Sequence, residues 1–377
     1  MADFYCDFTN GDDTTGAGSS GNPYKTFGKI LSLTSGISTS GGNRIFIANT
    51  SAQVLSTIPT WSTGGTGWLD SDTANNPTMI LPWDNGGSIS LTMPNGTTVD
   101  PAFEIDGNSA VASIWSGAMQ GVIVLGGILH GTTSFVVDPG LNNALIRCKI
   151  YGGASTTALV DSTLQTALGC WLVGDSGVAG QDGFRAIGLC AYGNFIEGMT
   201  GIGMALSTGA TAIGNIIVDC DEIAIDVNSD GSVVLNNTII GNSTTGNVGI
   251  DLQTAAGDMP YIVNNIIMGF SGTSAYAVNS GSNLLTLVSH NSWHNNTNNL
   301  SSAAAIDDNN DVEGADPLTN SGSGDYSVTI TSAAYQGGGI KAAANVQNRG
   351  ADQKDNAGGG SAGISQGLHT IDSQISA

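Results

Sequence analysis

The sequence repeats one five-residue unit, seen most clearly in Asn215-Ile-Ile-Val-Asp219, Asn237-Thr-Ile-Ile-Gly241 and Asn265-Ile-Ile-Met-Gly269. Eight copies begin at residues 127, 148, 170, 194, 215, 237, 265 and 291, so successive copies start 21, 22, 24, 21, 22, 28 and 26 residues apart. Stacked coils of a solenoid, joined by loops of variable length, produce such a spacing. The repeat predicts that equivalent residues lie one above another on neighbouring coils.

Each position of the unit has its own character. The first is Gly, Cys, Cys and then Asn five times, which predicts a buried ladder of amides that donate and accept along the stack. The third is large and apolar in every copy and predicts the core. Because side chains alternate along a strand, the second and fourth positions face outward. The fifth is usually Gly, as a tight turn requires, and Asp219 replaces that Gly.

The pattern predicts an all-β fold, a single-stranded right-handed parallel β-helix with a short N-terminal capping helix. Strand-forming Val, Ile and Thr fill the periodic segments, and further short strands are expected between the units. An antiparallel sandwich is the alternative, but its regular series of hairpin turns does not recur. The expected parts are an N-terminal strand and capping helix (1–43), the coils (44–300), and a C-terminal cap with a Gly/Ala/Ser-rich tail (301–377). The segments 44–48, 78–81, 88–93, 103–105 and 121–125 are expected to be earlier, less regular coils.

Composition excludes several classes of function. The formal net charge of −22 argues against binding to nucleic acid or to an anionic membrane surface, since both require Lys and Arg. No apolar run reaches membrane-spanning length, and the start of the chain lacks the basic and apolar regions of a signal peptide, which predicts synthesis in the cytoplasm without export. The five Cys have no close paired spacing and are expected to be reduced and buried. No cofactor is expected.

Both ends of the chain resemble the pectate-lyase-like right-handed β-helix superfamily. The N-terminal resemblance lies in Phe4-Tyr-Cys-Asp-Phe-Thr-Asn-Gly-Asp-Asp and Asn22-Pro-Tyr-Lys-Thr-Phe27, where Thr26 to Leu31 would be the capping helix. The C-terminal resemblance lies in Asp316-Pro-Leu, Asp325-Tyr-Ser-Val and Arg349-Gly-Ala-Asp352. The resemblance implies the fold; the superfamily includes polysaccharide lyases, glycoside hydrolases and phage virion proteins, so it leaves the activity open.

Catalytic candidates are few. A lyase needs a basic Arg or Lys, and none lies between Arg185 and Lys341, which leaves Arg147, Lys149 and Arg185. A glycoside hydrolase needs two carboxyl groups several ångströms apart. The candidates for that pair are Asp182, Glu197, Asp219 and Asp221, with Glu222 and Asp226 in the same acidic cluster. The favoured interpretation of these residues is that they are solvated turn residues that keep an acidic protein soluble.

Metal-binding candidates are weaker. The acidic segment that holds Asp307, Asp308 and Asp311 is similar to a loose cation-binding loop, but it lacks the Gly and the terminal Glu spacing of a calcium hand, so a solvated loop is the alternative. His290 and His294 share one turn without a third ligand nearby.

The outward positions of the unit are largely apolar, and a contiguous apolar strip calls for a cover. Either loops of the same chain fold over the strip or it forms a subunit interface, for which a trimer is favoured. The predicted interface residues are Ile128, Trp171, Val173, Phe195, Ile216, Val218, Ile240, Ile266 and Met268.

These observations lead to three hypotheses about function. The first is a non-enzymatic virion structural protein, a phage capsid decoration or tail-associated β-helix, located in the virion with other virion proteins and surface glycans as partners. The alternative is a carbohydrate-active enzyme, either a glycoside hydrolase or depolymerase or, with less support, a polysaccharide lyase. The third is an adhesin that binds glycans without cutting them.

Overall fold

The computed structural model describes residues 2–33, 42–57, 77–114, 121–137, 143–153, 156–207, 209–228, 231–253, 260–280, 287–301, 306–307, 312–323, 325–329, 332, 341–342 and 345–346. The chain divides into two units, Met1–Gly188 and Leu189–Ala377, which are described separately. The boundary falls within strand β15 (Asp182–Tyr192).

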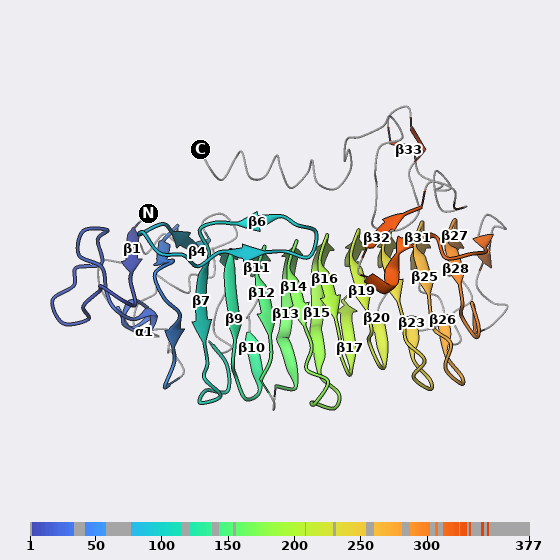
Figure 1. Cartoon of the computed structure of the whole chain (residues 1–377), viewed down its shortest axis with the longest axis horizontal. Coiled ribbons are helices and arrows are strands. Elements are labelled where there is room, and N and C mark those ends of the chain that lie inside the picture. Colours follow the sequence, from blue (N-terminus) through green and yellow to red (C-terminus); the bar gives the residue numbers. More distant parts are fainter. Residues whose placement is uncertain are drawn as a thin grey trace. The chain divides into compact units, whose positions relative to one another are not determined.

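The first unit is built from two parallel sheets and one short helix (Figure 1). Its first sheet contains β1 (Asp3–Cys6), β2 (Arg44–Ala48), β4 (Thr78–Trp83), β8 (Val122–Leu125), β10 (Phe135–Val137), β11 (Ala144–Ile146) and β13 (Ala158–Leu168). Its second sheet contains β3 (Gln53–Val54), β7 (Phe103–Asp106), β9 (Gly127–His130), β12 (Lys149–Tyr151) and β14 (Trp171–Val173). Strands β5 (Leu91–Thr92) and β6 (Thr98–Val99) form a separate antiparallel hairpin.

The second unit repeats the two-sheet plan. Its first sheet contains β17 (Ile202–Leu206), β18 (Thr211–Ile213), β20 (Ile223–Val227), β21 (Val233–Leu235), β23 (Val248–Leu252), β24 (Tyr261–Val263), β26 (Tyr276–Asn279), β27 (Leu287–Ser289) and β29 (Ile306–Asp307). Its second sheet contains β16 (Phe195–Glu197), β19 (Ile216–Val218), β22 (Thr238–Ile240), β25 (Ile266–Met268), β28 (Ser292–His294) and β30 (Val312–Glu313). Two antiparallel pairs follow: β31 (Leu318–Asn320) with β32 (Asp325–Val328), around the 3-10 turn η1 (Ser321–Ser323), and β33 (Lys341–Ala342) with β34 (Asn345–Val346).

The register confirms the stacked repeat. In the first unit Ile105, Leu129, Ile150 and Leu172 are successive partners and are fully buried. The second unit has an equivalent column of Ile196, Ile217, Ile239, Ile267 and Trp293, of which only Trp293 has any exposed area. The third position of the unit is therefore the core, as predicted.

The predicted amide ladder is present in the second unit. Asn194, Asn215, Asn237, Asn265 and Asn291 are buried, and each of the first four donates from Nδ2 to Oδ1 of the next at 2.9–3.0 Å. The Oδ1 of each later Asn also accepts the backbone N–H of the Asn before it. The amide nitrogen and the amide oxygen of every interior Asn side chain therefore both take part in hydrogen bonds.

The predicted capping helix is α1 (Phe27–Leu31), which packs Phe27, Ile30 and Leu31 inward. The hydroxyl of its N-cap residue Thr26 accepts from the N–H of Lys29. The same hydroxyl donates to the carboxylate of Asp13 at 2.6 Å, which ties the helix start to the preceding loop. No helix in the described part of the chain is long and apolar enough to cross a bilayer.

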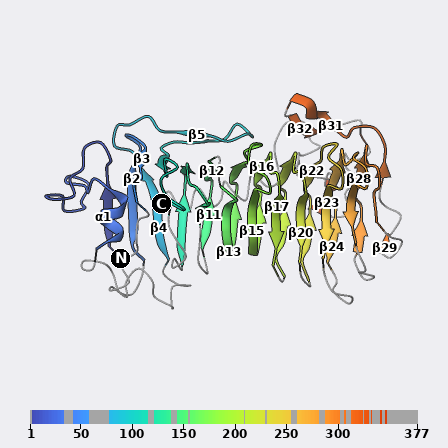
Figure 2. The ribbon, with the colours of Figure 1, turned by 90° about the horizontal axis from the view of Figure 1, so that it is seen from below.

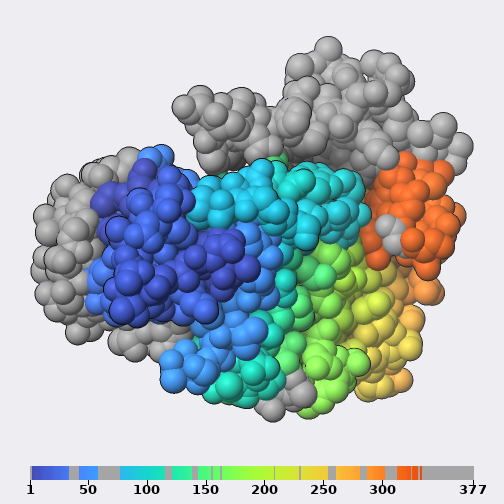
Figure 3. Space-filling model, turned by 60° about the vertical axis from the view of Figure 1, so that its left-hand side comes forward, coloured from blue at the N-terminus to red at the C-terminus, as the bar shows by residue number. Residues whose placement is uncertain are grey.

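Two hairpins lie over the outward face of the second sheet, one in each unit. In the first unit Leu91, Met93 and Val99 of the β5–β6 hairpin form a small core against Ile128 and Trp171. Figures 2 and 3 show this hairpin, in cyan, lying over the coils. The prediction that 88–93 is an early coil is therefore wrong, because Leu91 and Thr92 pair antiparallel with β6 and cover the coils. In the second unit the hairpin β31–β32 places Leu318 and Val328 in a cluster with apolar outward residues, namely Ile240, Ile266 and Met268.

Candidate functional site

Two predicted carboxylates, Glu197 and Asp219, lie on adjacent coils of the second unit. Glu197 ends β16 and pairs with Val218 of β19, so Asp219 follows directly after the partner of Glu197. Neighbouring coils of a parallel sheet are about 4.8 Å apart. The repeat therefore brings these two side chains to the same region of the outer surface.

The backbone at Asp219 has the left-handed conformation, with φ of 56°. Gly198 and Gly269 have positive φ at the equivalent position, and Asp adopts this conformation more readily than most residues do. The Asp219 side chain is at the surface, where a ligand can reach it. Partial desolvation, and then the negative charge of Asp221, raise the pKa of the Asp219 carboxyl above its ordinary value.

Asp221 has a structural task. Its Oδ1 accepts hydrogen bonds from Nδ2 of Asn242 at 2.8 Å and from the hydroxyl of Thr244 at 3.3 Å. These contacts connect the turn that holds Asp221 to the turn of the next coil. Since its side chain is held there, Asp221 affects the site through its negative charge, which raises the pKa of Asp219.

Tyr326, from the hairpin β31–β32, completes the group. Its ring lies 5.8 Å from the ring of Phe195. Desolvation, together with the charges of Glu197 and Asp219, raises the pKa of the Tyr326 phenol. The phenol is therefore protonated at neutral pH and able to donate a hydrogen bond beside the two carboxylates. We call Glu197, Asp219, Asp221 and Tyr326 the carboxylate site.

The fourth predicted carboxylate, Asp182, is not part of this group. It lies in the first unit, where it accepts from Nε of Arg185 at 3.0 Å. Arg185 also contacts Asp161 at 3.1 Å and lies over the ring of Phe135. Asp182 thus belongs to a surface ion-pair network. Glu222 is exposed and Asp226 is buried on β20, where Asn228 donates to it.

A second polar cluster, in the first unit, surrounds His130. Its Nε2 lies 2.8 Å from Oε1 of Glu104, and its Nδ1 lies 3.5 Å from Oδ1 of Asp106. The imidazole stacks on the ring of Tyr151, with centroids 4.4 Å apart and planes 7° apart. Burial, followed by the charges of Glu104 and Asp106, raises the pKa of Tyr151 to about 12.

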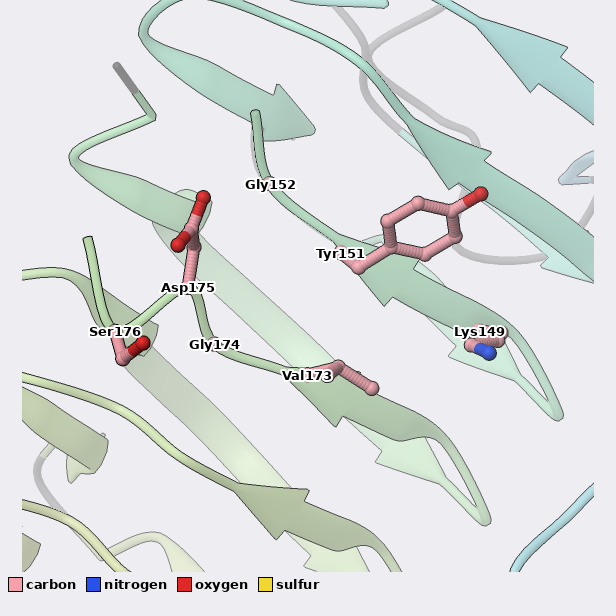
Figure 4. A pocket seen from close by; sticks show the side chains of 7 residues that line it. All are labelled: Lys149, Tyr151, Gly152, Val173, Gly174, Asp175 and Ser176. Atoms are coloured by element: carbon pink, nitrogen blue, oxygen red, sulfur yellow. The ribbon is translucent and has the colours of Figure 1, made fainter. Parts of the chain in front are cut away.

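Lys149 extends this cluster along the sheet. Its Nζ lies 3.8 Å from the ring centroid of Trp171 and 5.4 Å from that of Tyr151, so two aromatic faces hold the ammonium. Beside Lys149 and Tyr151 is an open cavity of about 350 Å³ (Figure 4), lined also by Gly152, Val173, Gly174, Asp175 and Ser176.

Sequence reasoning missed Glu104 and Asp106, although a signal for them exists. Phe103-Glu-Ile-Asp-Gly107 is a further copy of the repeat unit, 24 residues before the copy at Gly127, and its register with β9 places Glu104 and Asp106 opposite Ile128 and His130. The copy begins with Phe rather than with a small residue. The large Phe103 ring fits at this position because its partner on the next coil is Gly127, where a Cβ would lie 2.7 Å from the ring.

The other predicted sites have mixed outcomes. Asp308 and Asp311 lie outside the described residues, and only the backbone of Asp307 is described. Among the described residues no group of three His, Cys, Asp or Glu could hold a metal ion. His290 contacts Ser289 Oγ, and His294 contacts the carbonyl oxygen of Gly314. Of the three candidate bases, Lys149 lies on the second sheet and Arg185 on the first, so they do not share a face.

Much of the predicted interface strip is covered by the chain itself. Ile128 and Trp171 pack under the β5–β6 hairpin, and Ile240, Ile266 and Met268 pack under the β31–β32 hairpin. Of the remaining four, Phe195 faces Tyr326 and Val218 is buried, whereas Val173 and Ile216 are partly exposed. The subunit interface and the trimer stay predictions.

Comparison with known proteins identifies the fold. No protein-family model matches the chain, and no curated protein matches it in sequence. Pectate lyase Pel9A superposes with a TM-score of 0.50 and 12% identity over 94% of this chain and 97% of its own. A GH136 lacto-N-biosidase from Eubacterium ramulus gives a TM-score of 0.44 at 10% identity over 83% of this chain and 67% of its own. XylC in complex with xylose gives 0.43 at 10% identity over 84% and 86%.

These findings confirm the right-handed parallel β-helix and the likeness to the pectate-lyase-like fold. They also correct the first hypothesis from the sequence. The chain superposes over almost its whole length on a pectate lyase, so the prediction of a non-enzymatic virion structural protein is contradicted, and the carbohydrate-active alternative is favoured. The first hypothesis depended in part on an uncovered apolar strip, which the chain's own hairpins cover to a large extent.

Proposed function

We propose that the chain is a glycoside hydrolase whose acid and base are Asp219 and Glu197. One observation carries the proposal: Asp219 is a surface carboxyl with a raised pKa, on the coil next to a second carboxyl. Hydrolysis of a glycosidic bond requires such a pair, in which one group is protonated and the other ionised. The likeness in fold to pectate lyase Pel9A supports a carbohydrate-active role and does not choose between hydrolysis and elimination.

The two carboxyls have different environments and hence different roles. The raised pKa of the Asp219 carboxyl suits the group that donates a proton to the departing glycosidic oxygen. Glu197 acts as the nucleophile at the anomeric carbon. Glu197 is in register with Val218, the residue before Asp219, on coils about 4.8 Å apart, so we expect the two carboxyls to lie near the separation of about 5–5.5 Å found in retaining enzymes. We therefore expect retention, through a glycosyl ester on Glu197 that water then hydrolyses with Asp219 as base.

Tyr326 positions this pair rather than reacting. Its phenol stays protonated beside Glu197 and Asp219, so it is able to donate a hydrogen bond to either carboxylate and hold it in place. An elimination mechanism fits the site less well, because no Lys or Arg occurs between residues 185 and 341 to act as the base.

The test compares carboxylate variants on a panel of xylan, polygalacturonate and galactan, with release of reducing ends as the readout. Asp219→Asn and Glu197→Gln are each expected to lower kcat by about 100-fold or more, because each removes a proton-transfer or nucleophilic group. Glu222→Gln is the matched control, since Glu222 is an exposed carboxylate three residues after Asp219. Full activity of Asp219→Asn would contradict the assignment.

The pH dependence gives a separate signature of the same pair. The reaction needs Asp219 protonated, so activity falls as the pH rises through the raised pKa of this carboxyl. This fall at higher pH should disappear from the residual activity of Asp219→Asn, because the amide has no acidic proton to lose.

A further inference from the structure

The cavity of the first unit is built from side chains of three successive coils. Tyr151 on β12 pairs with His130 on β9 and with Val173 on β14. His130 stacks on one face of the Tyr151 ring, and the cavity is bordered by Tyr151 and Val173 (Figure 4). The ring is thus held from behind by the imidazole, which Glu104 and Asp106 hold in turn.

Polar groups of both signs border the same cavity. Lys149 Nζ is held over the rings of Trp171 and Tyr151. The N–H of Asp175 donates to Oε1 of Gln181 at 2.6 Å, and Oδ1 of Asp175 accepts from the N–H of Gly177 at 2.9 Å. In the described part of the chain no protein hydrogen bond is made to Asp175 Oδ2, so this oxygen is available as an acceptor, and the hydroxyl of Ser176 lies beside it at the surface (Figure 4).

This combination has the features of a small-molecule site. A volume of about 350 Å³ is at the lower end of the range for ligand pockets, which combine apolar walls with a few fixed polar groups. An aromatic ring beside an apolar Val173 suits the apolar face of a sugar ring. The ammonium and the carboxylate suit its hydroxyl groups as donor and acceptor.

We infer that this cavity binds one neutral sugar ring of a glycan, which stacks against Tyr151 and hydrogen-bonds to Lys149 and Asp175. The ligand class rests on the proposed hydrolase function; the site rests on the geometry of the first unit alone. Neutral rather than acidic sugars are expected because Lys149 and Asp175 offset each other in charge and the net charge of −22 repels polyuronates.

Binding is measured by isothermal titration of the full chain carrying Asp219→Asn, so that no cleavage occurs during the titration. The probes are xylohexaose, a neutral galacto-oligosaccharide and hexagalacturonic acid. We expect at least one neutral probe to bind and hexagalacturonic acid to bind at least tenfold more weakly. Tyr151→Ala should weaken the neutral probe about tenfold or more, Asp175→Asn should weaken it less, and Tyr151→Phe, which keeps the ring, should retain most of the affinity.

Tyr261→Ala is the matched control, because Tyr261 is an exposed tyrosine on a strand of the other sheet. Circular dichroism and the melting temperature show whether each variant is folded. If Tyr151→Ala does not fold, the conservative variants Tyr151→Phe and Asp175→Asn still test the site. The inference is overturned if no probe binds, or if Tyr151→Ala binds as tightly as Tyr261→Ala does. Probe binding that depends on Tyr151 without any hydrolysis by the unmutated chain would refute the hydrolase instead and leave this site standing.

Discussion

At the scale of single residues, the Asn ladder shows how the sequence commits the chain to one register. Each interior Asn donates one amide hydrogen to the next Asn and the other to a backbone carbonyl, as Asn237 does to Asn265 and to Ala212. Its Oδ1 accepts from the side chain and the backbone of Asn215. A slip by one residue would leave every one of these buried groups unpaired.

Asn237→Ala should therefore lower the free energy of unfolding by about 2–4 kcal/mol, since several buried donors and acceptors lose their partner at once. Asn237→Asp should not rescue stability, because a carboxylate has no hydrogen to donate to Asn265 or Ala212. Urea denaturation followed by circular dichroism measures the effect. Asn320→Ala, at an exposed Asn of β31, is the control and should change stability by less than about 1 kcal/mol. Equal stability of the two Ala variants would show that the ladder contributes nothing.

The residue pattern predicted some of the candidate site and not the rest. Glu197 and Asp219 were predictable because the repeat places them at outward or turn positions of neighbouring coils. The role of Tyr326 was not, since it lies more than 100 residues away in a segment outside the repeat, and only the three-dimensional structure brings it to Phe195. Asp182 was grouped with the wrong carboxylates because sequence spacing does not show that Arg185 pairs with it.

At the scale of elements, the two hairpins account for an outer surface that would otherwise be too apolar for water. Leu318 and Val328 of the β31–β32 hairpin are almost fully buried against Ile266 and Met268. Since Tyr326 belongs to the same hairpin, the packing of this element also positions one residue of the carboxylate site.

Leu318→Ala should loosen this hairpin locally while the stacked coils remain folded. Removal of a buried Leu side chain costs about 2–5 kcal/mol, which is enough to open an element held by few contacts. Hydrogen–deuterium exchange should rise in residues 318–328 and at Met268, with little change at β19 and β22. Leu189→Ala is the matched control, because Leu189 is 59% exposed. Unchanged exchange in the hairpin would contradict its role as a cover.

Coils were easier to predict than their covers. The strands β19, β22 and β25 belong to repeat units that each begin with Asn and carry Ile at the third position. Because the same residue types recur, each copy of the unit strengthens the prediction of the others. The hairpins occur once each, and segment 88–93 looks like a coil strand because alternation of apolar residues is the same in a parallel coil and in an antiparallel hairpin. The strands just before each unit, such as β18 and β21, are only three residues long and lack a constant residue.

At the scale of the whole molecule, the fold alone does not choose between binding and cleavage, because parallel β-helices support many functions. What favours cleavage is a pair of carboxyls on adjacent coils, in which burial and the charge of Asp221 raise the pKa of Asp219. The charge of −22 adds a constraint on the substrate, since neutral glycans approach such a surface more readily than polyanions do.

The most direct test is proton NMR of the products formed when the full chain is incubated with xylan, galactan and polygalacturonate. The account predicts cleavage of a neutral glycan into saturated products with a new reducing end, whose first-formed anomer has the configuration of the bond that was cut. An unsaturated sugar at the new non-reducing end would instead reveal elimination, and no cleavage of any glycan would contradict the proposed hydrolase altogether.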